Sequence, residues 1–130
     1  MIEVACAVIT NDKGEVLVVQ RSEEMKLPLK WEFAGGKLEQ GETAEECLVR
    51  EINEELGVVI SIESNLGSYP YSYPKQEIVL HAFLCKILSG VVLLKEHIAL
   101  KWLMPNQLLN LDWAEADLPI VGNYLKTLDN

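Results

Sequence analysis

The 130-residue sequence lacks long apolar runs and closely spaced cysteines. No stretch approaches the roughly 18 uninterrupted apolar residues of a membrane-spanning helix, so we expect no membrane partner. The opening MIEVACAVIT has an acidic residue and no basic leader, which predicts a first strand rather than a secretory signal. Cys6, Cys47 and Cys85 form no CxxC pair. We therefore expect buried free thiols in a reducing cytoplasm, not zinc ligands or disulfides.

Basic residues are also scarce, with 11 lysines and arginines against 20 acidic residues and a net charge of -9. Affinity for a nucleic-acid polymer rests on neutralising its phosphates, so such a partner is not expected. A small phosphorylated molecule can still bind if divalent cations bridge it to the protein. Repeats and obvious linkers are missing, and the length fits a single domain over residues 1–130. Monomer and homodimer both remain open.

The hydrophobic pattern predicts strands before and after a central helix. A turn at Asn11–Gly14 joins the first two strands into an expected hairpin, and the stretch 21–30 is expected to be a loop. Strands are predicted at 2–9, 15–20, 31–33, 60–69, 77–88 and 99–103, with a turn at 70–76, a helical turn at 105–109 and a last helix at 119–128. This order predicts an α/β or α+β fold with a mixed sheet covered by helices. The strand order does not follow from the pattern.

The central helix is predicted over Thr43–Leu56. Apolar residues recur every four positions from Leu48 to Leu56, as one buried stripe requires. Thr43 and Glu46 have the spacing of a capping box at the start. Gly57 stands where helices commonly end.

Three carboxylates lie on one face of this helix, beside the apolar stripe. Glu51, Glu54 and Glu55 have i, i+3 and i+4 spacing, and like charges at that spacing repel. A hard cation such as Mg²⁺ or Mn²⁺ would offset the repulsion. The alternative is an exposed acidic face that lysines and arginines neutralise.

The loop before the helix favours the metal hypothesis. Gly35 and Gly36 permit close approach of the backbone to a ligand, and Lys37 adds a cation that attracts phosphate. Gly41 and Glu42 then close the loop onto the start of the helix. Loop and helix are therefore predicted to form one site.

This stretch resembles the Nudix box. The pattern is a glycine, five residues, a glutamate, seven residues and then R-E-U-x-E-E-x-G-U, where U is aliphatic. Every fixed position is filled: Gly36, Glu42, Arg50, Glu51, Ile52, Glu54, Glu55, Gly57 and Val58. The flanking WEFAGGKLEQGE, together with segments 95–102 and 114–121, is similar to the MutT-like branch and most similar to its CTP pyrophosphohydrolases.

The resemblance implies a Nudix-type α/β/α sandwich, with a mixed sheet between the box helix and a C-terminal helix. It also implies Mg²⁺ or Mn²⁺ held by Glu51, Glu54 and Glu55 and by the carbonyl of Gly36. Arg50 would keep these carboxylates and the preceding loop in register. A plain i,i+4 pair of Arg50 with Glu54 is compatible with that task.

The family pattern adds residues outside the box. Glu96 corresponds to a loop glutamate that serves as a metal ligand or as the base that takes the water proton; on its own it would suggest a solvated turn. Arg21 and Lys37 match basic positions that contact phosphates. For Arg21 the alternative is a surface salt bridge of small value.

The residues that would contact the base are less specific. Asp117 matches a base-reading position, where a carboxylate can accept from the N4 amine of cytosine or from the edge of guanine, but it also suits a helix N-cap. Phe33 would stack on the base or fill the core. His81, between apolar neighbours, is expected to be structural, and the role of His97 is left open.

These expectations describe an enzyme that converts a nucleoside triphosphate to the monophosphate and pyrophosphate. CTP, dCTP or a 5-modified dCTP is the first expectation, and 8-oxo-dGTP or a broad set of damaged nucleotides is the second. A nucleotide-binding Nudix module without catalysis is a further alternative. Such modules commonly lose box carboxylates, and this chain retains all of them.

Overall fold

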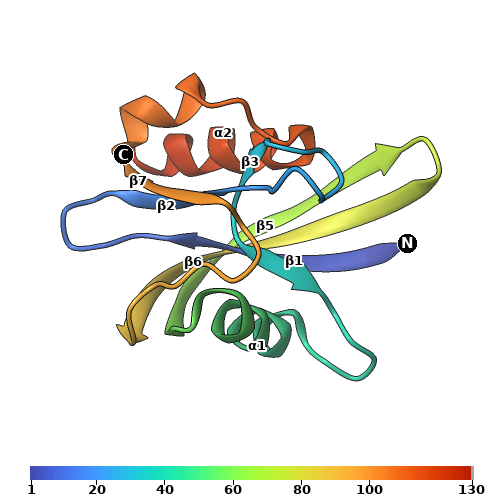
Figure 1. Cartoon of the computed structure of the whole chain (residues 1–130), viewed down its shortest axis with the longest axis horizontal. Helices are drawn as coiled ribbons and strands as arrows, with labels where there is room; N and C mark the ends of the chain where they lie inside the picture. Colours follow the sequence, from blue (N-terminus) through green and yellow to red (C-terminus); the bar gives the residue numbers. More distant parts are fainter. Residues whose placement is uncertain (130) are drawn as a thin grey trace.

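The computed structural model describes residues 1–129 as an α/β/α sandwich, in which α1 covers one face of the sheets and α2 the other (Figure 1). A four-stranded mixed sheet has the order β4-β1-β6-β5, and a three-stranded antiparallel sheet has the order β3-β2-β7. The elements are β1 (Ile2–Ile9), β2 (Val16–Gln20), β3 (Trp31–Glu32), β4 (Gly35–Lys37), α1 (Ala44–Leu56), β5 (Val59–Tyr73), β6 (Gln76–Ser89), β7 (Ala99–Leu103), η1 (Pro105–Asn110), η2 (Glu115–Asp117) and α2 (Leu118–Thr127). The predicted fold class is confirmed.

The expected hairpin between the first two strands is wrong. β1 pairs with β4 on one side and in parallel with β6 on the other, while β2 lies in the second sheet. Only an isolated bridge between Thr10 and Val16 joins them beyond the turn. The reason is burial: residues 5–9 are all buried, so β1 is a central strand with neighbours on both sides. No edge of β1 remains for β2.

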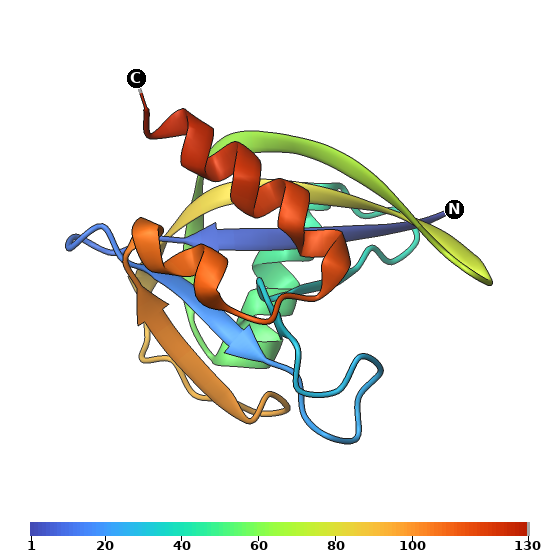
Figure 2. The same ribbon diagram turned by 90° about the horizontal axis from the view of Figure 1, so that it is seen from above.

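A turn lies within the predicted stretch 70–76, but it is shorter than expected. β5 and β6 continue into this stretch as a long hairpin, with Tyr73 opposite Gln76 and only Pro74 and Lys75 between them. Pro70 lies inside β5, which has a neighbour on one side only. An edge strand tolerates proline because one row of its N–H groups needs no partner. The tip of this hairpin and the loop 21–30 project toward the same side of the molecule (Figure 2).

Alternation along β1 divides the core into two clusters. Side chains from one face of β1 pack with those of α2, and side chains from the other face pack with those of α1. The first cluster includes Cys6, Val8, Ile120, Val121 and Tyr124; the second includes Ala5, Ala7, Ile9, Leu48, Ile52 and Leu56. Three cysteines are free and buried, as expected.

The box helix forms as its sequence predicts. The Thr43 hydroxyl accepts from the Glu46 N–H at 3.1 Å, and the Glu46 carboxylate accepts from the Thr43 N–H at 2.9 Å. Gly57 ends the helix with φ +71°, in the left-handed region, and its N–H donates to the Asn53 carbonyl at 3.0 Å. Within residues 1–129, no helix has the length and apolar character needed to cross a membrane.

Candidate active site

The acidic face of α1 lies against β4, where Gly36 leaves room for a glutamate carboxylate. A Cβ atom built on Gly36 would stand 2.3 Å from the Glu51 carboxylate carbon, so only glycine lets that carboxylate lie over the strand. The Gly36 carbonyl, the predicted backbone ligand, has the Cys47 thiol 3.5 Å away. Loop glycine and helix carboxylate therefore form one unit, as predicted.

Glu55 is the carboxylate of this face with a buried oxygen that lacks a hydrogen-bond partner, although the Gly35 backbone contacts the carboxylate. It is half-buried, and its Oε1 atom is buried without a hydrogen bond in the described chain. Burial, followed by the charges of Glu51 and Glu32, raises the pKa of Glu55 to about 8. An inward-facing carboxylate oxygen without a donor is an atom that a cation would satisfy.

The candidate metal ligands do not enclose an ion by themselves. Among residues 1–129, no three acidic, histidine or cysteine side chains converge closely enough to enclose an ion. Burial raises the pKa of Glu51, while the side chain of Glu54 is 59% exposed. Mg²⁺ commonly binds one or two carboxylates together with substrate phosphates rather than an all-protein cage. The arrangement of Glu51 and Glu55 fits that mode.

Arg50 connects the helix to the loop before it. Its Nε and one terminal nitrogen donate to the two oxygens of Glu42 at 2.6 and 2.8 Å. This bidentate contact lowers the pKa of Glu42 to about 2. The other terminal nitrogen lies 3.2 Å from Glu54 and 3.4 Å from Glu51. The register task expected of Arg50 and its i,i+4 pair with Glu54 coexist in this geometry.

Glu32, which the sequence did not single out, lies at the centre of the site. One of its oxygens accepts from Arg21 at 2.9 Å, and the other lies 2.8 Å from His97 Nε2. Arg21 thus makes the ion pair considered as its alternative role. The sequence signal for Glu32 was a charged residue between two aromatic residues, Trp31 and Phe33. Both of these are buried in the structure. Alternation turns the Glu32 side chain to the other face of the strand.

Asp117 is buried at the far end of the site. Its Oδ2 atom accepts from the Phe33 N–H at 2.8 Å, and it caps no helix N–H although it stands at the N-cap position of α2. The capping interpretation is therefore wrong. Burial, followed by the charge of Glu32, raises the pKa of Asp117 to about 8. Phe33 is buried, with its ring centroid 4.9 Å from that of Trp113, as the core interpretation expects.

Two adjoining cavities link these residues. The smaller, about 200 Å³, reaches from Asp117 to Gly36, Lys37 and Glu55. The larger, about 490 Å³, extends from Asp117 outward, between the loop 21–30 and the tip of the β5–β6 hairpin. Their shared lining residues are Val4, Arg21, Glu32, Leu80 and Asp117. Predicted phosphate-contacting and base-contacting residues thus line one continuous hollow.

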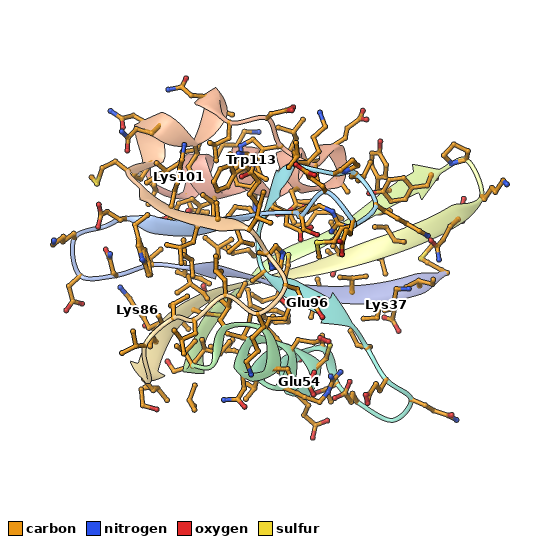
Figure 3. All side chains as sticks on the ribbon, in the orientation of Figure 1. Lys37, Glu54, Lys86, Glu96, Lys101 and Trp113 are labelled. Carbon is orange, nitrogen blue, oxygen red and sulfur yellow. The ribbon has the colours of Figure 1, made fainter. Side chains whose placement is uncertain are left out.

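Glu96 lies outside both cavities, on the segment between β6 and β7. Its side chain is exposed and lines a neighbouring surface hollow together with residues 22–25. Its charge nevertheless adds to the raised pKa of Glu55. Lys37, Glu54 and Glu96 occur in the region of β4 and α1, away from Lys86, Lys101 and Trp113 (Figure 3).

The NUDIX domain model matches residues 2–124. The chain belongs to the Nudix family. It is 36% identical to the CTP pyrophosphohydrolase of Escherichia coli K12, covering 96% of this chain and 92% of the relative. It is 30% identical to the 8-oxo-dGTP diphosphatase of the same organism, covering 93% and 94%. The solution structure of the E. coli ORF135 protein matches with a TM-score of 0.86 and 34% identity, over 99% of this chain and 91% of that one.

In this Nudix hydrolase the structure brings most of the predicted residues together. Gly36, Lys37, Glu55, Arg21, Phe33 and Asp117 line the linked cavities. Arg50, Glu51 and Glu54 lie on the same helix as Glu55 without lining either cavity, and Glu96 lines a neighbouring hollow. Glu32 and His97 are additional residues of the Nudix site, joined across 65 positions of sequence. His81, by contrast, bonds Ser68 at 2.7 Å and Glu3 at 3.0 Å, in a cross-strand contact outside the linked cavities.

Proposed function

We propose that this Nudix hydrolase cleaves the α–β phosphoanhydride bond of a nucleoside triphosphate, so that water addition yields the monophosphate and pyrophosphate. The continuous hollow from Glu55 to Asp117 carries the proposal. Its larger part, about 490 Å³, falls in the range of roughly 300–1,000 Å³ typical of small-molecule sites and would take the nucleoside. The smaller part would take the phosphates, beside Gly36 and Lys37.

Glu51, Glu54 and Glu55 would hold Mg²⁺ or Mn²⁺, with the Gly36 carbonyl and Glu96 as further candidate ligands. The orphan oxygen of Glu55 supports this assignment. A bound divalent cation would neutralise phosphate charge and lower the pKa of a water molecule. Glu96 is alternatively the base that takes the water proton.

The protein's own cations would orient the phosphate chain. Lys37 is exposed at the cavity edge, ready to form a point-charge contact. Arg21 uses Nε and one terminal nitrogen within the protein, bonding Lys26 and Glu32. A guanidinium has five N–H donors, so Arg21 retains donors for phosphate. Arg50 would act indirectly, by keeping the carboxylates and the Glu42 loop in register.

Asp117 supports a cytosine nucleotide as substrate. With a pKa of about 8, it is mainly a neutral acid at pH 7, offering one O–H donor and one remaining acceptor. The N3 acceptor and N4 amine of cytosine match that pair, whereas the N1–H and N2 amine of guanine match an ionised carboxylate. The likeness to a CTP pyrophosphohydrolase also favours CTP, dCTP or a 5-modified dCTP. The 8-oxo-dGTP diphosphatase relative keeps guanine, or a broad range, as the second candidate.

A nucleotide panel incubated with protein and Mg²⁺, with products resolved by chromatography, tests the proposal. We expect monophosphate and pyrophosphate, with cytosine nucleotides preferred; a tenfold preference for guanine would overturn the base assignment. Glu54→Gln should cut turnover at least a hundredfold while nucleotide binding persists. The matched control is Glu45→Gln, an exposed first-turn residue of the same helix. Unchanged turnover in Glu54→Gln would refute the metal assignment, whereas nucleotide binding without turnover in wild type would favour a non-catalytic module.

The free thiols and the net charge support proposals about the cellular compartment and the partners of the enzyme. Three free, buried cysteines suit a reducing compartment, and we place the enzyme in the cytoplasm. The net charge of -9 argues against a nucleic-acid polymer as partner. Sedimentation would decide between monomer and homodimer.

A further inference from the structure

The segment 90–98 between β6 and β7 has neither helix nor strand, and two backbone hydrogen bonds attach it to the fold. The Leu93 N–H donates to the carbonyl of the last residue of α1 at 2.9 Å. The Ile98 N–H donates to the carbonyl of the last residue of β2 at 3.1 Å. Four residues between these anchors, 94–97, have backbone positions that neither bond sets directly.

The side chain of His97 supplies a third anchor. It is only 2% exposed, and its Nε2 atom lies 2.8 Å from Glu32 Oε2. Glu32 belongs to β3, and its other oxygen accepts from Arg21. A bond between desolvated polar groups is costly to break because each partner is then left buried and unpaired. His97 thus fixes the segment to β3, whose Glu32 lines both linked cavities.

Glu96, the neighbour of His97, has no comparable restraint of its own. Its carboxylate is exposed, and no hydrogen bond or ion pair holds it within residues 1–129. Its charge still reaches Glu55, whose pKa it helps to raise. The position of Glu96 therefore depends on the backbone on either side, and His97 is the adjacent fixed point.

We propose that His97 is a positioning residue, whose bond to Glu32 holds Glu96 at the metal-binding end of the active site. The inference rests on the proposed metal site, and its kinetic test rests in addition on the proposed hydrolysis. A purely structural buried pair would stabilise the fold without any energetic link to Glu96. The two cases predict different coupling energies between His97 and Glu96, and a double-mutant cycle measures this energy.

The kinetic test compares two substitutions at His97. His97→Leu removes the donor, and we expect kcat with CTP and Mg²⁺ to fall at least tenfold while KM changes less than twofold. His97→Gln retains an N–H near the position of Nε2 and should restore kcat to within about threefold of wild type. In a Glu96→Ala background, His97→Leu should cost less than a further twofold. A full tenfold loss in that background would show that His97 acts independently of Glu96 and would overturn the proposal.

A second readout needs no turnover. Paramagnetic broadening by bound Mn²⁺, measured on backbone amides by NMR, reports how close residue 96 lies to the ion. His97→Leu should weaken broadening at residue 96 at least twofold while leaving it unchanged at residue 55. Equal broadening at residue 96 in both proteins would refute the positioning role, even if no nucleotide is hydrolysed.

His81→Leu is the matched control, since it also removes a histidine–glutamate contact, at 3.0 Å, but outside the linked cavities. It should leave kcat and the broadening at residue 96 at wild-type values. A comparable loss of both in this control would show a general effect of histidine removal and overturn the proposal. If wild type hydrolyses no triphosphate, the proposed function fails, while the broadening experiment still decides the role of His97.

Discussion

Replacing Glu55 by glutamine tests whether its buried carboxylate lowers the free energy of unfolding of the metal-free protein. Burial, aided by Glu51 and Glu32, raises the pKa of Glu55 from its ordinary value of 4.5 to about 8. Between these pH values the folded chain binds a proton that the unfolded chain has released. The stability linked to this proton is fully present below pH 4.5 and is lost as pH rises through about 8.

The size of the effect follows from the two pKa values. A rise of about 3.5 pH units, at about 1.36 kcal/mol each, sets a ceiling of roughly 5 kcal/mol on the loss. Partial solvent access and shared titration with Glu51 reduce this, so we expect about 2–3 kcal/mol. Glu55→Gln keeps the shape and removes the charge. Without metal, the variant should match wild type near pH 5 and exceed its free energy of unfolding by that amount at pH 9.

Urea unfolding in EDTA at pH 5, 7 and 9 measures the difference. Glu54→Gln is the control because its side chain is 59% exposed, so the substitution removes a charge from the same helix without relieving a buried carboxylate. Adding Mg²⁺ or Mn²⁺ should stabilise wild type and leave the Glu55 variant unchanged. A Glu55 variant less stable than wild type at pH 9, or a difference independent of pH, would refute the reasoning.

Three further predictions concern the loop, the base end and the register arginine. Gly36→Ala places a Cβ 2.3 Å from a box carboxylate and should weaken Mn²⁺ binding at least tenfold by calorimetry, whereas Gly122→Ala, with no atom within 4 Å, should bind normally. Because Asp117 ionises near pH 8, the ratio of kcat/KM for CTP over GTP should fall about tenfold from pH 7 to 9, and Asp117→Asn should abolish that pH dependence. Arg50→Lys loses one of two bonds to Glu42 and should lower the urea midpoint of unfolding; an unchanged midpoint would contradict the register role.

The helix and its loop were predictable because their determinants are local. The capping box, apolar stripe and terminal glycine of α1 all lie within residues 43–57, and each is present as expected. The carboxylate face follows from helical spacing alone. Only the close approach of Gly36 to Glu51 required the structure, although glycine at that position was the signal for it.

Partners distant in sequence could not be predicted from periodicity. The separation of β1 from β2 depends on β6, which pairs with β1 from residue 78 onward. The Glu32–His97 and Phe33–Asp117 contacts span 65 and 84 positions, and either polar side chain alone suggests an ordinary surface or cap. Periodicity and propensity predict the secondary structure of the segment that contains a residue. These contacts instead form where residues 31–33 pack against segments that come much later in the sequence.

The charges on α1 are divided in a way that bears on both stability and function. Arg50 reaches Glu42, Glu51 and Glu54, so an internal cation offsets the repulsion on the loop side of the helix. No such contact reaches Glu55, whose buried Oε1 has no donor in the described chain. A chain selected for stability alone would replace this carboxylate or pair it, because the contact with the Gly35 backbone only partly compensates its desolvation. Retaining it beside Gly36 in the cavity lining is a cost that an external cation would offset, so stability in metal-free protein and affinity for the ion should change in opposite directions whenever Glu55 is replaced.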